Sequence, residues 1–400
     1  MDLAMIQRTH FSLNTSLHPL KSALKTLSKQ QPLRLLFSKN SLAVLAIAAL
    51  AGCANKPGIS TAVSWDALEG WNNDQLSQSI PPLLAQCPKL EKKSTKWNKI
   101  CQRASTLDIS NEKRVNQFYK RYFQPHKIIG NNHQNTGLIT GYYEPLLKGS
   151  YTKSKRYNYP IYQKPKDLMR VDAAHNLLKV KDNKARGRMV NGKIRAYYSR
   201  AQIDSNKQPL KGNELLWVDS SDDAFFLHIQ GSGLVELEDG SIIGVAYADQ
   251  NGHPYRAIGR DLINMGAIEK EDISLQTIKA WLTENPQQAG ALKNKNPSYI
   301  FFSLRSDVEL GPRGSLNVPL TPERSVAVDR RIVPLGSPLW LNTTLPNSDQ
   351  TYQRLVFAQD TGGAINGPIR ADVFFGRGER AKQLAGEMKQ EGKIFILMPK

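Results

Sequence analysis

Residues 358–376 read Ala-Gln-Asp-Thr-Gly-Gly-Ala-Ile-Asn-Gly-Pro-Ile-Arg-Ala-Asp-Val-Phe-Phe-Gly, and an apolar run, 355–357, precedes them. A second apolar run, 369–375, contains Asp372. Short apolar runs bounded by glycine and proline are typical of buried strands. Asp360 follows the first run directly, so this stretch places one carboxylate at a strand end and another within a strand.

A third acid, Asp329, lies in a similar setting, because it follows the apolar run 325–328. An acid in apolar surroundings is costly unless it is paired, hydrogen-bonded or protonated. Three aspartates that are each flanked by strand-forming residues predict a small β-barrel with carboxylates that converge at one face.

The net charge of the 400-residue chain is +19, and residues 1–52 contribute +5 of it with six Lys/Arg and one Asp. The length suggests two or three domains. A strongly basic chain favours an anionic partner, such as nucleic acid, a membrane surface or an acidic polymer. No recognition helix or zinc finger is evident, which disfavours nucleic acid. Peptidoglycan would suit this charge through the carboxylates of its stem peptides, whereas a basic surface that only serves solubility is the alternative.

The N-terminal region has the features of a lipoprotein signal peptide. Ten apolar residues, 42–51, are too few to span a bilayer, and Arg34 and Lys39 precede them. Residues 50–53, Leu-Ala-Gly-Cys, resemble the bacterial lipoprotein box. We therefore expect a signal peptide at 1–52, a lipid anchor on Cys53 and a linker to residue 61. A buried helix with an incidental cysteine is the alternative, and the forty residues before the apolar run are long for a signal peptide.

Residue 54 is alanine, and the aspartate that retains lipoproteins in the inner membrane is missing there. This indicates an outer-membrane anchor that faces the periplasm. Cys87 and Cys101 form an even pair in an exported chain, so we expect them to form a disulfide worth about 3 kcal/mol. Two buried free thiols are the alternative.

The segment 296–399 closely resembles the C-terminal part of the membrane-bound lytic murein transglycosylase A family, with a resemblance that extends back to about Gly137. The matching stretches are residues 296–302, 318–321, 324–330, 334–336, 359–365 and 370–372. The three aspartates look like the three-Asp barrel of that family. The resemblance implies a mainly β fold in which a double-psi β-barrel carries the catalysis, with a few flanking helices. This barrel would combine 62–145 with 309–400, and a second β-barrel, 146–308, would be inserted and form the other wall of a glycan cleft.

The resemblance also implies the reaction. A lytic transglycosylase cleaves the β-1,4 bond between N-acetylmuramic acid and N-acetylglucosamine and leaves a 1,6-anhydromuramic end, in cell-wall turnover and remodelling. Asp372 would be the acid and base, Asp360 would tune it, and Asp329 would be a structural or subsite carboxylate. We expect no cofactor and no metal.

Other classes remain open. The chain could be a non-catalytic peptidoglycan-binding lipoprotein or a hydrolytic glycosidase on the same polymer, because glycosidases usually need two carboxylates. A metal-dependent hydrolase would use the aspartates as oxygen ligands, although no histidine accompanies them. The expected partners are glycan strands, the outer-membrane lipid and possible cell-wall enzymes, with no nucleic acid.

The remaining candidate site residues come from matching strand-like stretches. Residues 137–145 would enter the active site, and 224–233 would be a strand that ends in a glycine turn. His228 alternates with apolar residues there and is expected to be a satisfied core histidine. The candidate substrate-binding residues, besides Asp329, are Thr140, Tyr142, Tyr143, Gln230, Ser232 and Gly363. Tyr142 and Tyr143 would point to opposite faces of a strand, so at most one would face a sugar.

Clear helical periodicity occurs at residues 110–122. Val115, Phe118, Tyr119 and Tyr122 share one face, and Ser110 or Asn111 would cap the helix. Further helices are expected before Gly266, after Ser274 and at 379–390, where Gly392 would end the helix before a last strand, 394–398.

Overall fold

The computed structural model describes residues 57–172, 176–179 and 185–400. The predicted signal peptide and Cys53 lie outside the described residues. Within these described ranges, no helix is both long enough and apolar enough to cross a bilayer.

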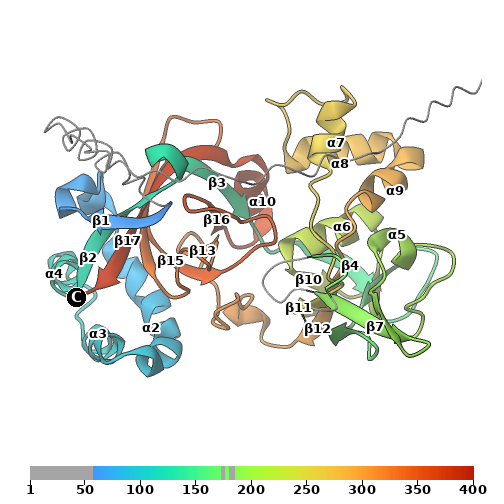
Figure 1. The fold of residues 1–400 in the computed structure, drawn as a ribbon, viewed down its shortest axis with the longest axis horizontal. Helices are drawn as coiled ribbons and strands as arrows, with labels where there is room; N and C mark the ends of the chain where they lie inside the picture. Colours follow the sequence, from blue (N-terminus) through green and yellow to red (C-terminus); the bar gives the residue numbers. More distant parts are fainter. Residues whose placement is uncertain (1–56, 173–175, 180–184) are drawn as a thin grey trace, which may run out of the picture. The chain divides into compact units, whose positions relative to one another are not determined.

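Among the described residues, six strands form a closed barrel in the order β17-β14-β15-β13-β16-β3, with β3 pairing back onto β17 (Figure 1). The barrel is made of β3 (Gly137–Tyr142), β13 (Ser325–Val328), β14 (Pro338–Thr344), β15 (Thr351–Asp360), β16 (Ala371–Phe374) and β17 (Lys389–Pro399). The pairs β13–β15 and β16–β3 are parallel, and the pairs that β14 and β17 make are antiparallel. The mainly β barrel fold that the sequence predicted is therefore confirmed.

The barrel can close because β17 is long enough to pair with both β3 and β14. Its first residues, 389–392, pair with β3, and residues 393–396 pair with β14, so one long strand joins both edges of the sheet. Gly392 lies inside β17 opposite Gly137, so the prediction that it ends a helix is wrong. The helix α10 (Gly378–Glu387) ends earlier, and β17 begins two residues later.

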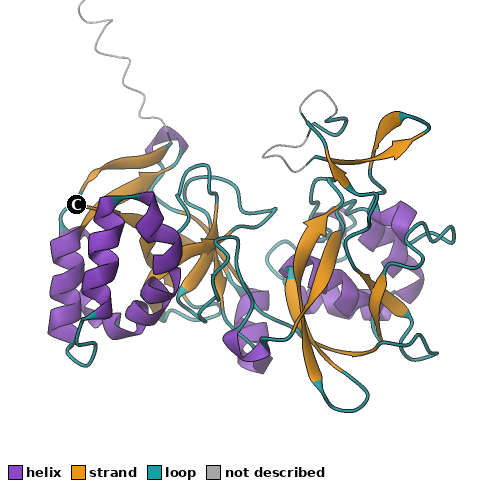
Figure 2. Ribbon diagram, turned by 90° about the horizontal axis from the view of Figure 1, so that it is seen from below, coloured by secondary structure: helices purple, strands orange, loops and turns teal. Residues whose placement is uncertain are grey.

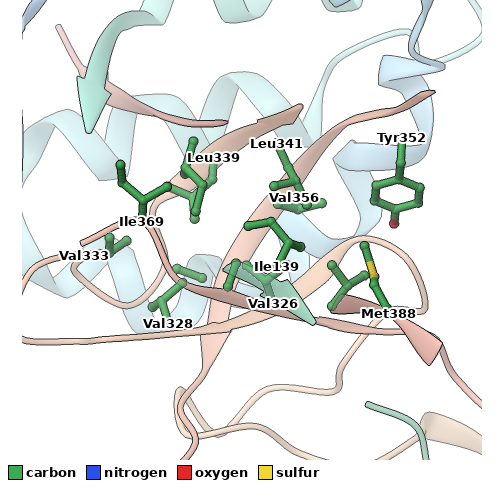
Figure 3. Packing of buried hydrophobic residues seen from close by; sticks show 14 of the residues in the cluster. Ile139, Val326, Val328, Val333, Leu339, Leu341, Tyr352, Val356, Ile369 and Met388 are labelled. Carbon is green, nitrogen blue, oxygen red and sulfur yellow. The ribbon is translucent and has the colours of Figure 1, made fainter. Parts of the chain in front are cut away.

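The barrel core consists of aliphatic side chains from every strand. Ile139, Val326, Val328, Leu339 and Val356 are all at most 1% exposed and point toward one another (Figure 3). Burial of each such side chain stabilises the fold by roughly 1.5–3 kcal/mol. The alternate residues of β13, β16 and β3 face outward, where an apolar cluster of Ala327, Phe374 and Tyr142 with loop residues lies on the same face as the polar side chains of these strands.

Three helices, α2 (Ile80–Leu90), α3 (Thr95–Ser105) and α4 (Glu112–Tyr122), pack on the outer side of β14, β15 and β17 (Figure 2). The predicted helix at 110–122 is confirmed, and Asn111 caps it by accepting a hydrogen bond from the backbone N–H of Arg114. Strands β2 (Phe123–Ile129) and β1 (Gly58–Ala62) extend the sheet beyond β17. In the structure a disulfide joins Cys87 of α2 to Cys101 of α3.

The chain between β3 and β13 builds a second sheet, in the order β12-β11-β10-β4-β9-β5. A bridge between Gln163 and Phe302 connects the end of β5 to β12, which curls this sheet toward closure. The strands are β4 (Leu146–Ser150), β5 (Tyr159–Tyr162), β9 (Glu214–Val218), β10 (Ser232–Glu236), β11 (Ile242–Gln250) and β12 (Ile300–Arg305). A small third sheet holds β6 (Met169–Arg170), β7 (Arg186–Val190) and β8 (Lys193–Ala196). The chain changes sheet between Tyr142 and Leu146, whereas the domain limits 145/146 and 308/309 stay a prediction.

Several helices belong to the inserted segment: α5 (Arg200–Ile203), α6 (Ser221–Gln230), α7 (Gly259–Asn264), α8 (Leu275–Glu284) and α9 (Pro286–Asn294). Short 3-10 helices are η1 (Trp65–Ala67), η2 (Trp71–Asn73), η3 (Leu76–Ser79), η4 (Glu91–Lys93), η5 (Asn131–His133) and η6 (Val308–Leu310).

The prediction of a strand at 224–233 is wrong, because most of this stretch forms α6. The Ser220 side chain accepts a hydrogen bond from the Asp223 N–H and caps the first turn. Gly231 ends the helix with a φ of 80°, a conformation that favours glycine. These helix-capping residues outweigh the strand preference of the aromatic residues between them.

Candidate active site

A row of paired residues crosses four neighbouring strands of the barrel. Asp360 at the end of β15 pairs with Ala327 of β13. Ala327 pairs with Asp372 of β16 on its other side, and Asp372 pairs with Thr140 of β3. The chain neighbours of Ala327 face the barrel core, so Ala327 itself faces outward. Paired residues share a face of the sheet, so the two acids lie on this outer face with their Cα atoms about 10 Å apart across two strand spacings.

The carboxyl group of Asp372 has one hydrogen-bond donor, the hydroxyl group of Thr140 at 2.5 Å. Burial raises the pKa of Asp372, and the negative charge of Asp360 raises it further. The guanidinium of Arg370 and the Thr140 hydrogen bond act in the opposite direction. The net effect is an elevated pKa, which favours a carboxylic acid that carries its proton.

Asp360 is surrounded by more donors. Its Oδ1 accepts from the backbone N–H and the hydroxyl of Ser315, each at 2.9 Å, and from the N–H of Thr361 at 2.8 Å. Its Oδ2 accepts from the hydroxyl of Tyr142 at 3.0 Å. Burial raises the pKa of Asp360, but these four hydrogen bonds oppose that effect. The pKa of Asp360 is therefore raised overall, as is that of Asp372, but the carboxylate of Asp360 accepts more hydrogen bonds than that of Asp372.

Asp329 has a different environment. Arg331 donates to both of its oxygens, at 2.8 and 2.6 Å, and the N–H of Gly367 donates at 2.9 Å. The arginine hydrogen bond is the largest cause that lowers its pKa, to about 2. A permanently ionised, paired carboxylate that holds a backbone loop has a structural role, so Asp329 does not offer a proton.

Tyr142, the last residue of β3, and Tyr143, which follows it, are both buried. Tyr142 packs under the acids and directs its hydroxyl to Asp360, whereas Tyr143 belongs to the barrel core. The backbone N–H of Tyr143 donates to the side-chain oxygen of Gln230 at 3.0 Å. Thr140 and Tyr142 thus contact the acids themselves, and Gln230 holds the chain as it leaves the barrel.

Within the described residues, Ser232 forms no side-chain hydrogen bond to the acids, and Gly363 lies three residues after Asp360. Ser232 is half-buried and starts β10, and Gly363 is exposed in the loop after Asp360. A Cβ atom added at Gly363 would lie 3.6 Å from the Cβ of Tyr255. The sequence analysis did not identify Ser315 or Tyr255 as site residues. A serine in a polar loop and a tyrosine far along the chain give no signal before the fold brings them to the aspartates.

Glu144, at the point where the chain leaves the barrel, is fully buried and ion-paired. Its oxygens lie 2.5 Å from Nη2 of Arg305, at the end of β12, and 2.5 Å from Nε of Arg377, next to β16. This ion-pair cluster fixes the two crossings between the sheets beside the aspartates.

Comparisons with known proteins agree with this geometry. Two family descriptions match, "MltA specific insert domain" at residues 138–303 and "3D domain" at residues 324–398. A membrane-bound lytic murein transglycosylase A of Vibrio cholerae serotype O1 is 27% identical over 388 residues, 90% of this chain and 95% of that protein. The crystal structure of a membrane-bound lytic murein transglycosylase from Agrobacterium tumefaciens has a TM-score of 0.75 and 30% identity, covering 86% of this chain and 98% of that chain.

The chain belongs to the membrane-bound lytic murein transglycosylase A family. The family description of the insert begins within β3 and ends within β12, which are the two strands beside the crossings. The crystal structure of the Escherichia coli family member with bound chitohexaose has a TM-score of 0.62 and 26% identity, covering 86% of this chain and 93% of that chain.

The described residues hold no metal cluster at the aspartates of this family member, since the ligand atoms that gather closely enough belong to Cys87, Glu91 and Cys101. The two cysteines of that group are bonded to each other. Asp329 would be the third carboxylate of a metal site, but it already forms an ion pair with Arg331.

Proposed function

We propose that this chain is a lytic transglycosylase that cleaves the β-1,4 bond between N-acetylmuramic acid and N-acetylglucosamine in peptidoglycan. The product would carry a 1,6-anhydromuramic end. Family membership supports the reaction class, since the Vibrio and Agrobacterium proteins are named lytic murein transglycosylases. The chitohexaose in the E. coli structure supports a β-1,4 glycan as the ligand.

The single observation that carries the proposal is the contrast between the two acids of one row. Both acids have a raised pKa, but among the described residues Asp372 has one hydrogen-bond donor and Asp360 has four. A carboxyl group that keeps its proton near neutral pH can protonate the glycosidic oxygen as the bond to C1 breaks. The leaving sugar takes this proton, and Asp372 becomes a carboxylate.

The same carboxylate then completes the reaction. It removes the proton from the C6 hydroxyl group of the muramyl residue, and the oxygen of that hydroxyl group forms the new bond to C1. No water is consumed, and Asp372 regains its proton, so one group serves as acid and base. Asp360 lies two strands away, and in its ionised form it raises the pKa of Asp372 and stabilises the positive charge that develops on the sugar ring.

We place the carbohydrate contacts around the exposed side of this row. The N-terminal half of β3, with Thr140, and the loop with Gly363 border it. Gln230 is the last residue of α6, and Ser232 is the first residue of β10. In this assignment Tyr142 supports Asp360, and Asp329 supports a backbone loop. Neither residue contacts a sugar.

We also propose that Cys53 carries a lipid that anchors the mature chain in the outer membrane, facing the periplasm. The name of the Vibrio relative, which includes "membrane-bound", supports membrane attachment. Contacts with other cell-wall enzymes stay a prediction.

Digestion of purified sacculi followed by mass spectrometry of the muropeptides tests the reaction. We expect products that end in 1,6-anhydromuramic acid. Reducing ends that each contain one added water would make the protein a hydrolase, and unchanged sacculi would make it a binding protein.

A further inference from the structure

A cavity of about 1150 Å³ opens in the inserted segment, and none of the three aspartates lines it. Its walls come from β5, β9, α5, α6, α8 and α9. Arg200 and His228 are among its lining residues, with exposed fractions of 3% and 8%. Buried polar groups are normally hydrogen-bonded, so the partners of these two side chains show whether the cavity offers free donors.

Arg200 is a buried cation without a direct ion pair among the described residues, although the negative charge of Asp204, in the same lining, acts on it. Its Nε donates to the carbonyl oxygen of Asn296 and its Nη2 to that of Ser298, at 3.1 and 2.7 Å. Nη2 also lies 3.0 Å from Nδ1 of His228. No carboxylate of the described residues lies within ion-pair distance of Arg200, and its Nη1 donates to none of their atoms. A buried guanidinium without a counter-charge is costly, so an incoming anion would be stabilised there.

His228 supplies a second unused donor. Because Arg200 donates to Nδ1, the proton of the neutral ring lies on Nε2. Burial and the charge of Arg200 both lower the pKa of His228, which keeps the ring neutral. Nε2 is buried and has no hydrogen-bond partner in the described residues. The expectation of a core histidine is right about its burial, but not about its being fully satisfied.

Two tyrosines of the lining add hydroxyl groups. Tyr162 and Tyr299 are 5% and 3% exposed, and within the described chain neither hydroxyl forms a hydrogen bond. The guanidinium of Arg200 lies 4.8 Å from the ring centre of Tyr299, so this tyrosine and the cation are neighbours. The cavity thus gathers four donors from four side chains, and an acceptor with more than one oxygen, such as a carboxylate, would satisfy several at once.

The outer lining carries both signs of charge. Lys153, which lies 5.0 Å over the ring of Trp217, and Lys211 are cationic, whereas Asp204 and Glu214 are anionic. Lys293 is neutralised by an ion pair of 2.5 Å with a neighbouring aspartate. These acids would repel a dianionic phosphate. A zwitterionic peptide, by contrast, has an amino group that can pair with them.

We propose that this cavity binds the carboxylate end of a short peptide, with Arg200, His228 and the two tyrosine hydroxyls around the carboxylate. The identity of the peptide as a peptidoglycan stem peptide rests on the proposed function. The segment of Tyr255 connects the two sites, since Tyr255 lies against the loop with Gly363. The N–H of the next residue, Arg256, donates to the side chain of Asn296, whose carbonyl oxygen accepts from Arg200. The cavity would therefore hold a peptide of the same polymer whose glycan strand is cleaved at Asp372.

Titration calorimetry of the mature chain with a free stem tetrapeptide tests this site. We expect the C-terminal amide of the same peptide to bind at least about tenfold more weakly, since a hydrogen bond to a charged group contributes about 1.5–3 kcal/mol. Tyr162→Phe and Tyr299→Phe should each weaken binding of the free peptide by about tenfold. Their melting temperatures should not change, because each removes only an unpaired hydroxyl. Tyr247→Phe, an exposed tyrosine outside the cavity, is the matched control.

Equal binding of the acid and the amide, or wild-type binding by both phenylalanine variants, would overturn the proposal. Inorganic phosphate that displaces the peptide at similar concentration would do so too. The titration needs no catalysis, so a failure of the proposed function shows separately as the absence of anhydro products from wild-type protein.

Discussion

Asp360 and Asp372 occupy one row of the barrel, yet the hydrogen bonds around them give them different roles. Asp360 terminates β15 and accepts four hydrogen bonds, whereas Asp372 lies within β16 and accepts one, from Thr140. Sequence alone could indicate both acids, because each follows or interrupts an apolar run. It could not show how the hydrogen bonds are divided between the two acids, because the donors Ser315 and Tyr142 come from distant parts of the chain.

Two substitutions should shift the alkaline limb of the pH–rate profile in opposite directions. The charge of Asp360 raises the pKa of Asp372, so Asp360→Asn lowers that pKa and moves the loss of activity to lower pH. The Thr140 hydrogen bond lowers the same pKa, so Thr140→Val should move the limb to higher pH. Initial rates on sacculi between pH 4 and 9 measure both, and shifts of the same sign would contradict the assignment.

Asp329 provides a test of a structural carboxylate. Its pKa is lowered to about 2, so its ion pair stabilises the fold above the unfolded pKa near 4, and this contribution is lost as the pH falls toward 2. Asp329→Asn should lower the free energy of unfolding at pH 7 by about 1–2 kcal/mol, given that Arg331 is partly exposed. Urea unfolding at pH 7 and pH 3 should show the difference from wild type narrowing in acid. A constant difference would exclude the ion pair as its cause.

At the scale of elements, periodic patterns predicted some segments correctly and others wrongly. The helix at 112–122 has its apolar side chains on one face and a clear cap, so its sequence signal is unambiguous. Residues 224–229 of α6 are apolar except for His228, because both sides of this part of the helix are covered. A helix without a polar face cannot be told from a buried strand by periodicity, and only its caps distinguish it.

The bond between α2 and α3 should stabilise the helical layer on the barrel. Cys87→Ser should lower the free energy of unfolding by about 3 kcal/mol, as expected for a loop of this size. Reductant should lower the free energy of unfolding of wild-type protein by the same amount. It should not lower that of the variant any further. Mass mapping without reduction identifies the linked peptides, and two freely alkylated thiols in periplasmic protein would rule out the bond.

At the scale of the whole molecule, the discontinuous barrel could not have been derived from spacing. β3 and β16 pair although more than 200 residues separate Thr140 from Asp372. Local patterns predict strands but not such distant partners, so only the family resemblance indicated the insertion. Glu144, Arg305 and Arg377 explain how an inserted segment can leave the catalytic barrel intact, since they tie both crossings together.

The proposed lipid anchor makes the position of the protein in the cell depend on Cys53. The lipobox predicts that Cys53→Ala gives a soluble or uncleaved form, whereas wild-type protein fractionates with the outer membrane and incorporates labelled palmitate. Cys87→Ser is a useful comparison, because it removes a cysteine, and with it the disulfide, without touching the lipobox. Unlabelled wild-type protein together with unchanged fractionation of Cys53→Ala would contradict the anchor.

The most direct test of the account is the rate at which Asp372→Asn releases muropeptides from sacculi. Asparagine preserves the size of the side chain but cannot deliver a proton, and general acid–base catalysis contributes about 10²–10⁴-fold. One group performs both proton transfers here, so we predict a loss at the top of that range, with glycan binding retained. Asp349→Asn, on an exposed turn, should retain wild-type activity. Release of anhydro products by Asp372→Asn at close to the wild-type rate would show that another group is the acid.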